Sequence, residues 1–172
     1  MKRAAHVNVR PLQATDLETF LSLVEDLAEY ENLPPPDARA RTRLAQDALA
    51  SPPRFRVLLG ELDDSIVGYA VFFETYSTFL ALPTLYLEDL FVLPEARRKG
   101  VGDALVRECA LEAVRLGCGR MEWQVLAWND LAIGFYEALG AAPLHADWTC
   151  YRLDGVALER LTQMTSKPAA SG

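Results

Sequence analysis

The sequence has 172 residues, of which 51% are hydrophobic and 24% charged, and its formal net charge is −7. This length and composition are enough to fill one core and favour one domain over two. The acidic balance gives a nucleic-acid-binding role no electrostatic support.

The N-terminal half of the sequence predicts strands and two helices. A short strand is predicted over 7–10. Thr15 and Glu18 form a capping-box signature, and apolar residues recur at helical spacing after it, so a helix is predicted over about 16–30. Three prolines separate it from a second predicted helix, over about 38–50. Apolar runs over 55–61 and 66–74 flank Asp63-Asp64, which predicts a hairpin.

The C-terminal half alternates strands with helices. The longest strand-like run is 84–93, and a basic loop leads from it into a helix over about 102–116. A strand over 121–127, a short helix over 131–139 and a last strand over 148–153 follow, and a small, polar tail from 165 onward is expected to fray. The alternation predicts an α/β layer structure.

The cysteines and the N-terminus bear on the compartment. Cys109, Cys118 and Cys150 match no metal spacing, and we interpret them as reduced packing residues. The first residues lack the apolar run of a signal peptide, and no run of about 18 apolar residues occurs. We therefore expect a cytoplasmic protein without a membrane span.

The loop Arg97-Arg98-Lys99-Gly100-Val101-Gly102 has the composition of an anion-binding turn. Glycines let successive N–H groups point at one spot, and the following helix adds the positive end of its dipole. The loop matches neither the longer dinucleotide-binding fingerprint nor the P-loop. Taken alone, such a loop is more commonly a structural turn, but its place between the longest strand and a helix favours phosphate binding.

Several motifs together resemble one enzyme family. Arg97-x-x-Gly100-x-Gly102 resembles the Arg/Gln-x-x-Gly-x-Gly/Ala loop of GNAT acetyltransferases, and Asn129 with Phe-Tyr-Glu-Ala-Leu-Gly-Ala at 135–141 resembles a second motif of that family. The order of elements agrees from Val7 to about Leu153. The segments Leu-Tyr-Leu-Glu-Asp-Leu-Phe-Val at 85–92, Leu-Ala-Glu-Tyr-Glu at 27–31 and Ala-Trp-Asn at 127–129 resemble the spermidine/spermine type of diamine acetyltransferase.

The resemblance implies the GNAT fold and its cofactor. That fold is a mixed, mostly antiparallel sheet of about six to seven strands flanked by helices, with strands four and five splayed to admit the pantetheine arm. The co-substrate would be acetyl-CoA, with no metal, and relatives commonly form homodimers. Spacing favours Arg97 over Arg98 as the pyrophosphate arginine. The expected cofactor-binding residues are Leu90, Phe91, Val92, Arg97, Arg98, Lys99, Gly100, Val101, Gly102, Asp103, Asn129 and Tyr136.

Two adjacent carboxylates interrupt the longest strand. Period two puts Tyr86, Glu88, Leu90 and Val92 on one face and Leu85, Leu87, Asp89, Phe91 and Leu93 on the other. Buried carboxylates are costly, so they favour a functional site, although pairing with a basic residue or a place near an exposed bulge is the alternative. Glu88 is the expected general base for a protonated amine, and Asp89 is expected to hold the substrate cation or shape the site.

The resemblance extends these roles to other residues. Tyr136 would donate a proton to the CoA thiolate, with a packing aromatic as the alternative. Glu31 would bind a distal ammonium group, and an ordinary helix-end carboxylate explains it equally well. Trp148 would line the acceptor side or belong to the core. The expected substrate-binding residues are Tyr30, Glu31, Glu88, Asp89, Glu122, Trp123, Gln124 and Trp148.

The expected reaction is acetyl transfer by direct attack of a small cationic amine, namely a polyamine, a diamine or a lysine-like amino acid. An amino-acid acceptor also carries a carboxylate, so a basic group near Glu31 would favour it, and the sequence places none there. The alternatives are an acetyltransferase for protein N-termini or lysines and a non-catalytic acyl-CoA-binding module.

Overall fold

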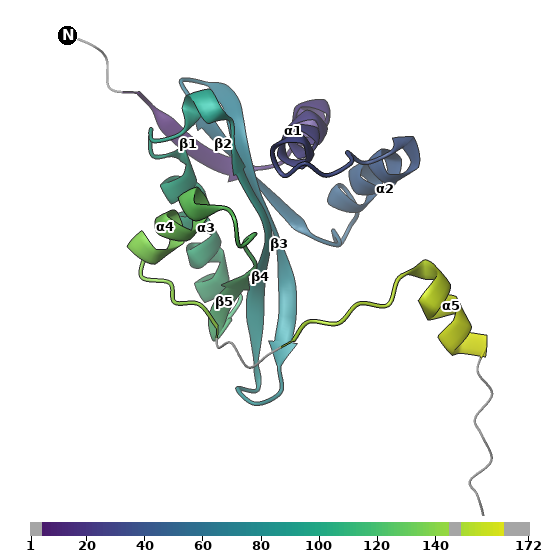
Figure 1. Cartoon of the computed structure of the whole chain (residues 1–172). Coiled ribbons are helices and arrows are strands. Elements are labelled where there is room, and N and C mark those ends of the chain that lie inside the picture. Colours follow the sequence, from purple (N-terminus) through teal and green to yellow (C-terminus); the bar gives the residue numbers. More distant parts are fainter. Residues whose placement is uncertain (1–4, 145–148, 164–172) are drawn as a thin grey trace, which may run out of the picture. The chain divides into compact units, whose positions relative to one another are not determined.

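A five-stranded sheet organises the first of the two parts into which the chain divides, residues 1–126 and 127–172. The computed structural model describes residues 5–144 and 149–163. The strands lie in sequence order, β1-β2-β3-β4-β5, and only the β4–β5 pair is parallel (Figure 1). Their bounds are Val7–Pro11 for β1, Arg56–Leu62 for β2, Ser65–Ser77 for β3, Leu82–Val92 for β4 and Arg120–Trp123 for β5.

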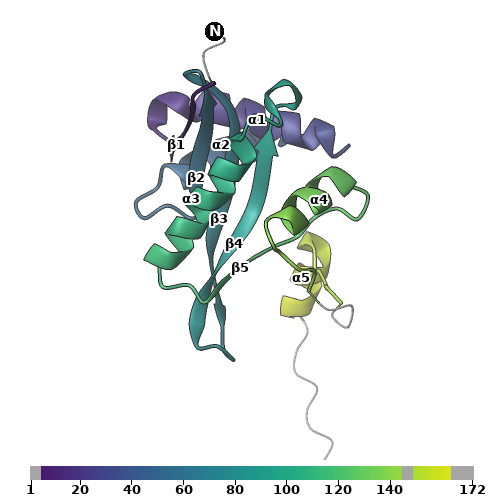
Figure 2. The same ribbon diagram turned by 90° about the vertical axis from the view of Figure 1, so that its left-hand side faces the viewer.

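Helices cover both faces of this sheet, as Figures 1 and 2 show. The helices α1 (Leu17–Tyr30) and α2 (Ala38–Ala48) lie on one face, and α3 (Val101–Arg115) lies on the other. A short 3-10 turn, Ala14–Asp16, precedes α1, and another, Pro94–Ala96, follows β4. The sheet therefore separates two cores, which we call the α1 face and the α3 face.

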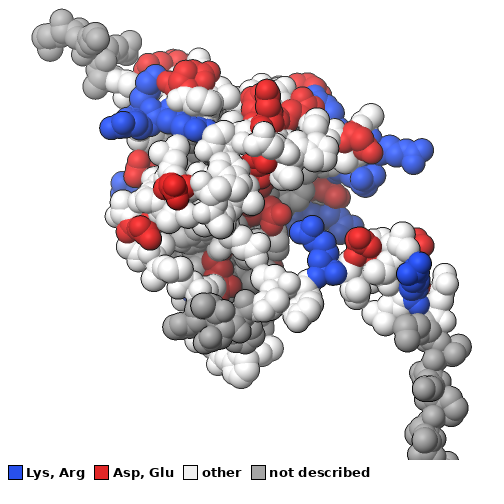
Figure 3. All heavy atoms as spheres, in the orientation of Figure 1, with Lys and Arg blue, Asp and Glu red and all other residues white. Residues whose placement is uncertain are grey.

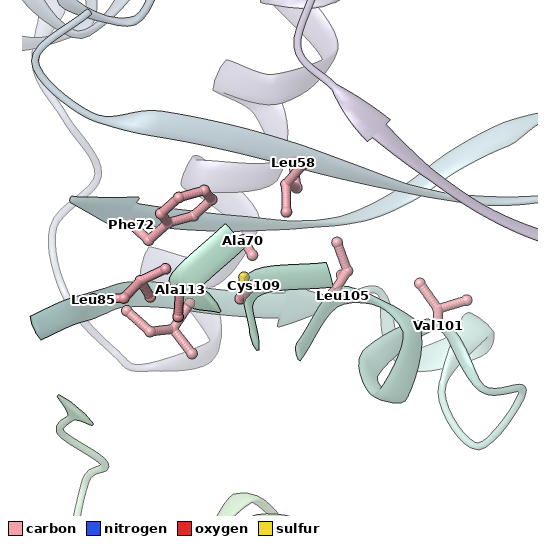
Figure 4. Close-up of a cluster of buried hydrophobic side chains, with 9 residues drawn as sticks. Leu58, Ala70, Phe72, Leu85, Val101, Leu105, Cys109 and Ala113 are labelled. Atoms are coloured by element: carbon pink, nitrogen blue, oxygen red, sulfur yellow. The ribbon is translucent and has the colours of Figure 1, made fainter. Parts of the chain in front are cut away.

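Each core is built from alternate residues of the strands. On the α3 face, Leu58, Ala70 and Phe72 pack against α3 residues such as Leu105 and Cys109 (Figure 4). On the α1 face, the α1 residues Phe20, Leu21 and Leu23 pack against buried strand residues, which are Val57, Leu59, Tyr69, Val71 and Phe91. This alternation is the period of two that a sheet with both faces buried requires.

A β-bulge at Glu88 changes which residues of β4 share a face, so the predicted grouping of these residues is wrong. Val71 is paired with Asp89 and Phe72 with Leu87, so Glu88 is an extra residue with no partner in β3. An extra residue reverses the alternation beyond it. Leu85 and Leu87 therefore share the α3 face with Leu90 and Val92, whereas Asp89, Phe91 and Leu93 lie on the α1 face with Tyr86. The strict period of two predicted the opposite grouping across this point.

Strands β4 and β5 pair over only four residues each, from Thr84–Arg120 to Leu87–Trp123. β5 ends at Trp123, whereas β4 continues to Val92. The edge of β4 from Glu88 onward therefore has no neighbour from β5. This agrees with the splayed strands that were predicted, and β5 is shorter than the predicted 121–127.

The second part contains two helices among its described residues, α4 (Asp130–Ala138) and α5 (Gly155–Gln163). The predicted last strand over 148–153 is wrong for 149–153, which pair with no strand in the described part of the chain. Asp154 instead starts α5, since its carbonyl accepts from Leu158 N at 2.7 Å. The described sheet thus has five strands, not the predicted six to seven, and Trp148 lies outside the described residues.

The other predicted helices and strands are confirmed with small shifts at their ends, and α5 alone was not predicted. Cys109 and Cys118 belong to the core on the α3 face, whereas Cys150 is exposed, and no disulfide joins these three described cysteines. Within residues 5–144 and 149–163, no helix combines the length and apolarity that crossing a membrane requires.

Candidate active site

The open edge of β4 presents backbone groups that could bind an extended ligand. Leu93 N donates to Val67 O in β3 at 2.9 Å. Antiparallel pairing alternates along a strand, so the N–H and C=O groups of Leu90 and Val92 point away from β3, toward the edge that β5 leaves free. Of the three residues predicted to pair with pantetheine, Phe91 has its backbone directed into the ladder instead.

The loop after β4 leads from this edge to the N-terminus of α3. Gly100 has φ of 88° and caps the helix, and Arg98 has φ of 59°. Helix geometry leaves the first N–H groups of α3, from Val101 to Asp103, without intrahelical acceptors. Arg98, Lys99 and Gly100 are exposed, whereas Val101 is buried beneath Gly60. Val101 thus anchors the N-terminal end of α3 in the core. The N–H groups of the first turn and the side chains of Arg98 and Lys99 are left available to bind an anion.

Arg97 differs from its two basic neighbours, because its side chain is half-buried and directed elsewhere. Its Nε donates to the carbonyl of Val92 at 2.9 Å. Its guanidinium carbon lies 4.6 Å from the centroid of the Tyr30 ring and 5.9 Å from that of Phe91. The guanidinium therefore stacks on rings of the α1 face, at the C-terminal end of α1.

Carboxylates gather on the same face near the end of α1. Burial, followed by the charges of Glu88 and Glu31, raises the pKa of Asp89 from 3.8 to about 6. Burial also raises the pKa of Glu31. No cationic side chain contacts Asp89 within the described residues. Its one hydrogen-bond donor there is the Tyr69 hydroxyl, at a long 3.5 Å from Oδ2.

Tyr69 was missed by the sequence analysis. It is fully buried, with its ring edge-on to Phe20 at 5.3 Å, and burial raises its pKa well above 10. It therefore stays a neutral donor to Asp89. The only sequence signal was a tyrosine inside an otherwise apolar strand, which does not by itself indicate a partner.

The remaining predicted acceptor residues divide between the two faces. Glu88 is exposed at the bulge. Met121 and Trp123 pack with the core on the α3 face, so Glu122 lies on the α1 side, where Arg120 Nε binds its Oε1 at 2.8 Å. Gln124 is exposed just beyond β5. The structure thus brings together Tyr30, Glu31 and Asp89, and places Trp123 in a core. On the molecular face in Figure 3, acidic side chains are scattered with basic ones between them.

In the second part, Asn129 caps α4 by accepting a hydrogen bond from Ala132 N at 3.1 Å. Tyr136 lies in α4, with its ring 5.3 Å from that of Phe135. The predicted catalytic and CoA-binding roles of these residues stay predictions, as does that of Trp148, outside the described residues.

Comparisons with known proteins agree on one family. The family model described as "Acetyltransferase (GNAT) family" matches residues 20–141. A thialysine N-epsilon-acetyltransferase of Bos taurus is 32% identical over 91% of this chain and 98% of its own length. An L-ornithine N5-acetyltransferase of Arabidopsis thaliana is 41% identical over 67% of this chain and 51% of its own length. An integron cassette protein from the V. cholerae mobile metagenome shares the fold, with a TM-score of 0.75 at 23% identity over 92% of this chain and 98% of its own.

Proposed function

We propose that this chain, which belongs to the GNAT family and is an acetyl-CoA-dependent N-acetyltransferase, acetylates a primary amine of a small cationic substrate. The observation that carries the proposal is the place of Asp89. A half-buried carboxylate without a cationic contact in the described residues lies in β4, on the stretch from Glu88 onward whose edge β5 leaves open. An ammonium group of the substrate would supply the missing charge. The names of the relatives, which act on thialysine and ornithine, support a small diamine or diamino acid.

The cofactor would bind along β4 and its loop. The N–H and C=O groups of Leu90 and the N–H of Val92 would pair with the pantetheine arm as an added strand does, while the Val92 carbonyl accepts from Arg97 Nε. The N–H groups from Arg98 to Asp103 would hold the pyrophosphate at the N-terminus of α3, with the side chains of Arg98 and Lys99 adding charge. The thioester would then lie near the bulge, beside the two adjacent carboxylates.

The transfer would proceed by direct attack in a ternary complex. The neutral amine nitrogen forms a bond to the thioester carbonyl carbon, and the carbon–sulfur bond breaks. Glu88, exposed at the bulge, takes the proton from the amine directly or through water. The thiolate of CoA receives a proton from Tyr136. A cytoplasmic location, expected from the cysteines and the N-terminal residues, and a homodimer, implied by the family resemblance, stay predictions.

An acceptor scan with two variants tests this function. Purified protein and acetyl-CoA are incubated with polyamines, diamines, diamino acids and a peptide, and released thiol is measured. Glu88→Gln and Tyr136→Phe should each lower kcat by about 10²- to 10⁴-fold, the usual contribution of a general base or acid. Retention of acetyl-CoA binding by both variants would show that they are folded. Turnover of the peptide alone, or of no amine while acetyl-CoA binds, would contradict the proposal.

A further inference from the structure

We propose that the guanidinium of Arg97 binds the α-carboxylate of the acceptor, which makes the acceptor a diamino acid rather than a polyamine. This inference rests on the proposed acetyltransferase function and narrows its substrate class. It concerns the side chain of Arg97 alone. The backbone of the same loop keeps the phosphate-binding role proposed above.

Arg97 is a half-buried cation without a carboxylate partner in the described part of the chain. Two other arginines are half-buried there, Arg10 and Arg41, and each is paired with two carboxylates. Arg97 donates Nε to the Val92 carbonyl and stacks on two rings, which fixes the plane of the guanidinium. No carboxylate in the described residues engages its terminal nitrogens. A fixed guanidinium with free parallel donors is the group best suited to bind a carboxylate.

The side chain of Arg97 lies on the acceptor side of the sheet. Tyr30 ends α1, and Phe91 belongs to the core on the α1 face. The first turn of α3, in contrast, packs through Val101 into the core on the α3 face. The loop backbone thus leads toward one face while the Arg97 side chain crosses to the other, where Asp89 lies.

Spacing on this face fits a diamino acid. Phe91 follows Asp89 by two residues, so the two lie about 7 Å apart along the strand. Six bonds separate the carboxyl carbon from the distal nitrogen in a lysine-like acid, which spans about 7 Å when extended. A carboxylate at Arg97 would therefore leave the distal amine beside Asp89 and Glu88.

Glu31 completes recognition of the amino-acid head group. It directly follows Tyr30, on whose ring the Arg97 guanidinium stacks, and burial raises the pKa of its own carboxylate. It could accept the α-ammonium group while Arg97 binds the α-carboxylate. The structure thus supplies the basic group near Glu31 that an amino-acid acceptor needs. A polyamine would instead bring a second ammonium group toward a guanidinium, which disfavours it.

Matched acceptor pairs test the role of Arg97. Ornithine and putrescine carry the same distal amine and differ in the carboxylate, and ornithine amide keeps the α-ammonium but loses the negative charge. The wild-type kcat/KM should be highest for ornithine. Arg97→Gln should lower kcat/KM for ornithine about 10- to 100-fold, mostly through KM, because a hydrogen bond between charged groups is lost. Putrescine and ornithine amide should change by less than about threefold, and Arg97→Lys should restore part of the ornithine activity.

Arg98→Gln is the control, because this exposed neighbour should raise the KM for acetyl-CoA without altering the ratio between ornithine and putrescine. An unchanged ratio in Arg97→Gln would overturn the role of Arg97. So would a rise in the KM for acetyl-CoA alone, which would return Arg97 to the pyrophosphate. Acetylation of no amine by the wild type would instead overturn the proposed function itself. Melting temperatures and acetyl-CoA binding identify a variant that fails to fold. If Arg97→Gln fails to fold, the ratio between ornithine and putrescine in Arg97→Lys tests the role of Arg97 instead.

Discussion

Asp89→Asn should stabilise the folded protein at neutral pH. Burial and the nearby charges of Glu88 and Glu31 raise the pKa of Asp89 from 3.8 to about 6. The folded state then binds more protons than the unfolded state between these two values, so the free energy of unfolding falls as pH rises through that window. A difference of about two pH units corresponds to about 3 kcal/mol at pH 7 and above. Asparagine removes this cost and can still accept the Tyr69 hydroxyl.

Urea unfolding of the wild type and Asp89→Asn over a pH series measures this effect. The variant should be more stable by about 2–3 kcal/mol above pH 7, and the difference should shrink to about 0.5 kcal/mol near pH 4 and vanish near pH 3, where Asp89 is neutral in both the folded and the unfolded state. Glu95→Gln is the matched control, because Glu95 is an exposed carboxylate that is not among the charges acting on Asp89, and its substitution should change stability by less than about 0.5 kcal/mol. Lower stability of Asp89→Asn at neutral pH, or an equal gain at pH 4, would refute the reasoning. The stabilised variant should also bind amines more weakly, as expected where a residue that lowers the stability of the folded protein is needed for function.

Three further substitutions test the sheet, the core and the loop that support the site. Gly60→Ala would place a Cβ 2.6 Å from Cγ1 of buried Val101, so it should cost about 1–3 kcal/mol in urea unfolding and raise the KM for acetyl-CoA. Arg10→Gln leaves the buried carboxylate of Asp16 without its cation and should cost about 3–5 kcal/mol at pH 7. That loss should shrink as pH falls, since Arg10 lowers the pKa of Asp16 and the stabilisation exists only above it. Arg98→Gln should weaken the dependence of the acetyl-CoA KM on salt, measured between low and high ionic strength.

The sequence was enough to predict most of the fold, because its signals were local. Prolines and apolar spacing located the helices and the strands of the first part within a few residues. The predicted capping box of Thr15 and Glu18 is wrong, because Gln13 and Asp16 form a capping box two residues earlier and Asp16 precedes α1. The last predicted strand failed because the residues Thr-Cys-Tyr-Arg-Leu at 149–153 are compatible with a strand but do not supply a partner. Asp154, a helix-starting residue, decided the local structure there instead.

The site was predicted less completely, because its geometry depends on an insertion in the pairing of two strands. Nothing in the residues 85–92 marks Glu88 as unpaired, yet the bulge there moves Asp89 to the α1 face. Without that shift, Asp89 would lie among the residues that pack against α3, remote from Glu31. The direction of the Arg97 side chain could not be predicted from the sequence either. The motif spacing places the backbone of Arg97 in the loop but says nothing about where its side chain points.

Two buried aspartates illustrate how the site differs from the scaffold. Asp16 accepts hydrogen bonds from the guanidinium of Arg10 at 2.6 and 3.0 Å, and this pairing lowers its pKa. Asp89 is also largely enclosed, but its pKa moves the other way, because burial is not compensated by a cation in the described residues. A chain selected for stability alone would pair or replace such a group. We propose that the compensating cation arrives with the substrate, while Arg97, whose guanidinium contacts no carboxylate in the described residues, is matched by the substrate's own anion.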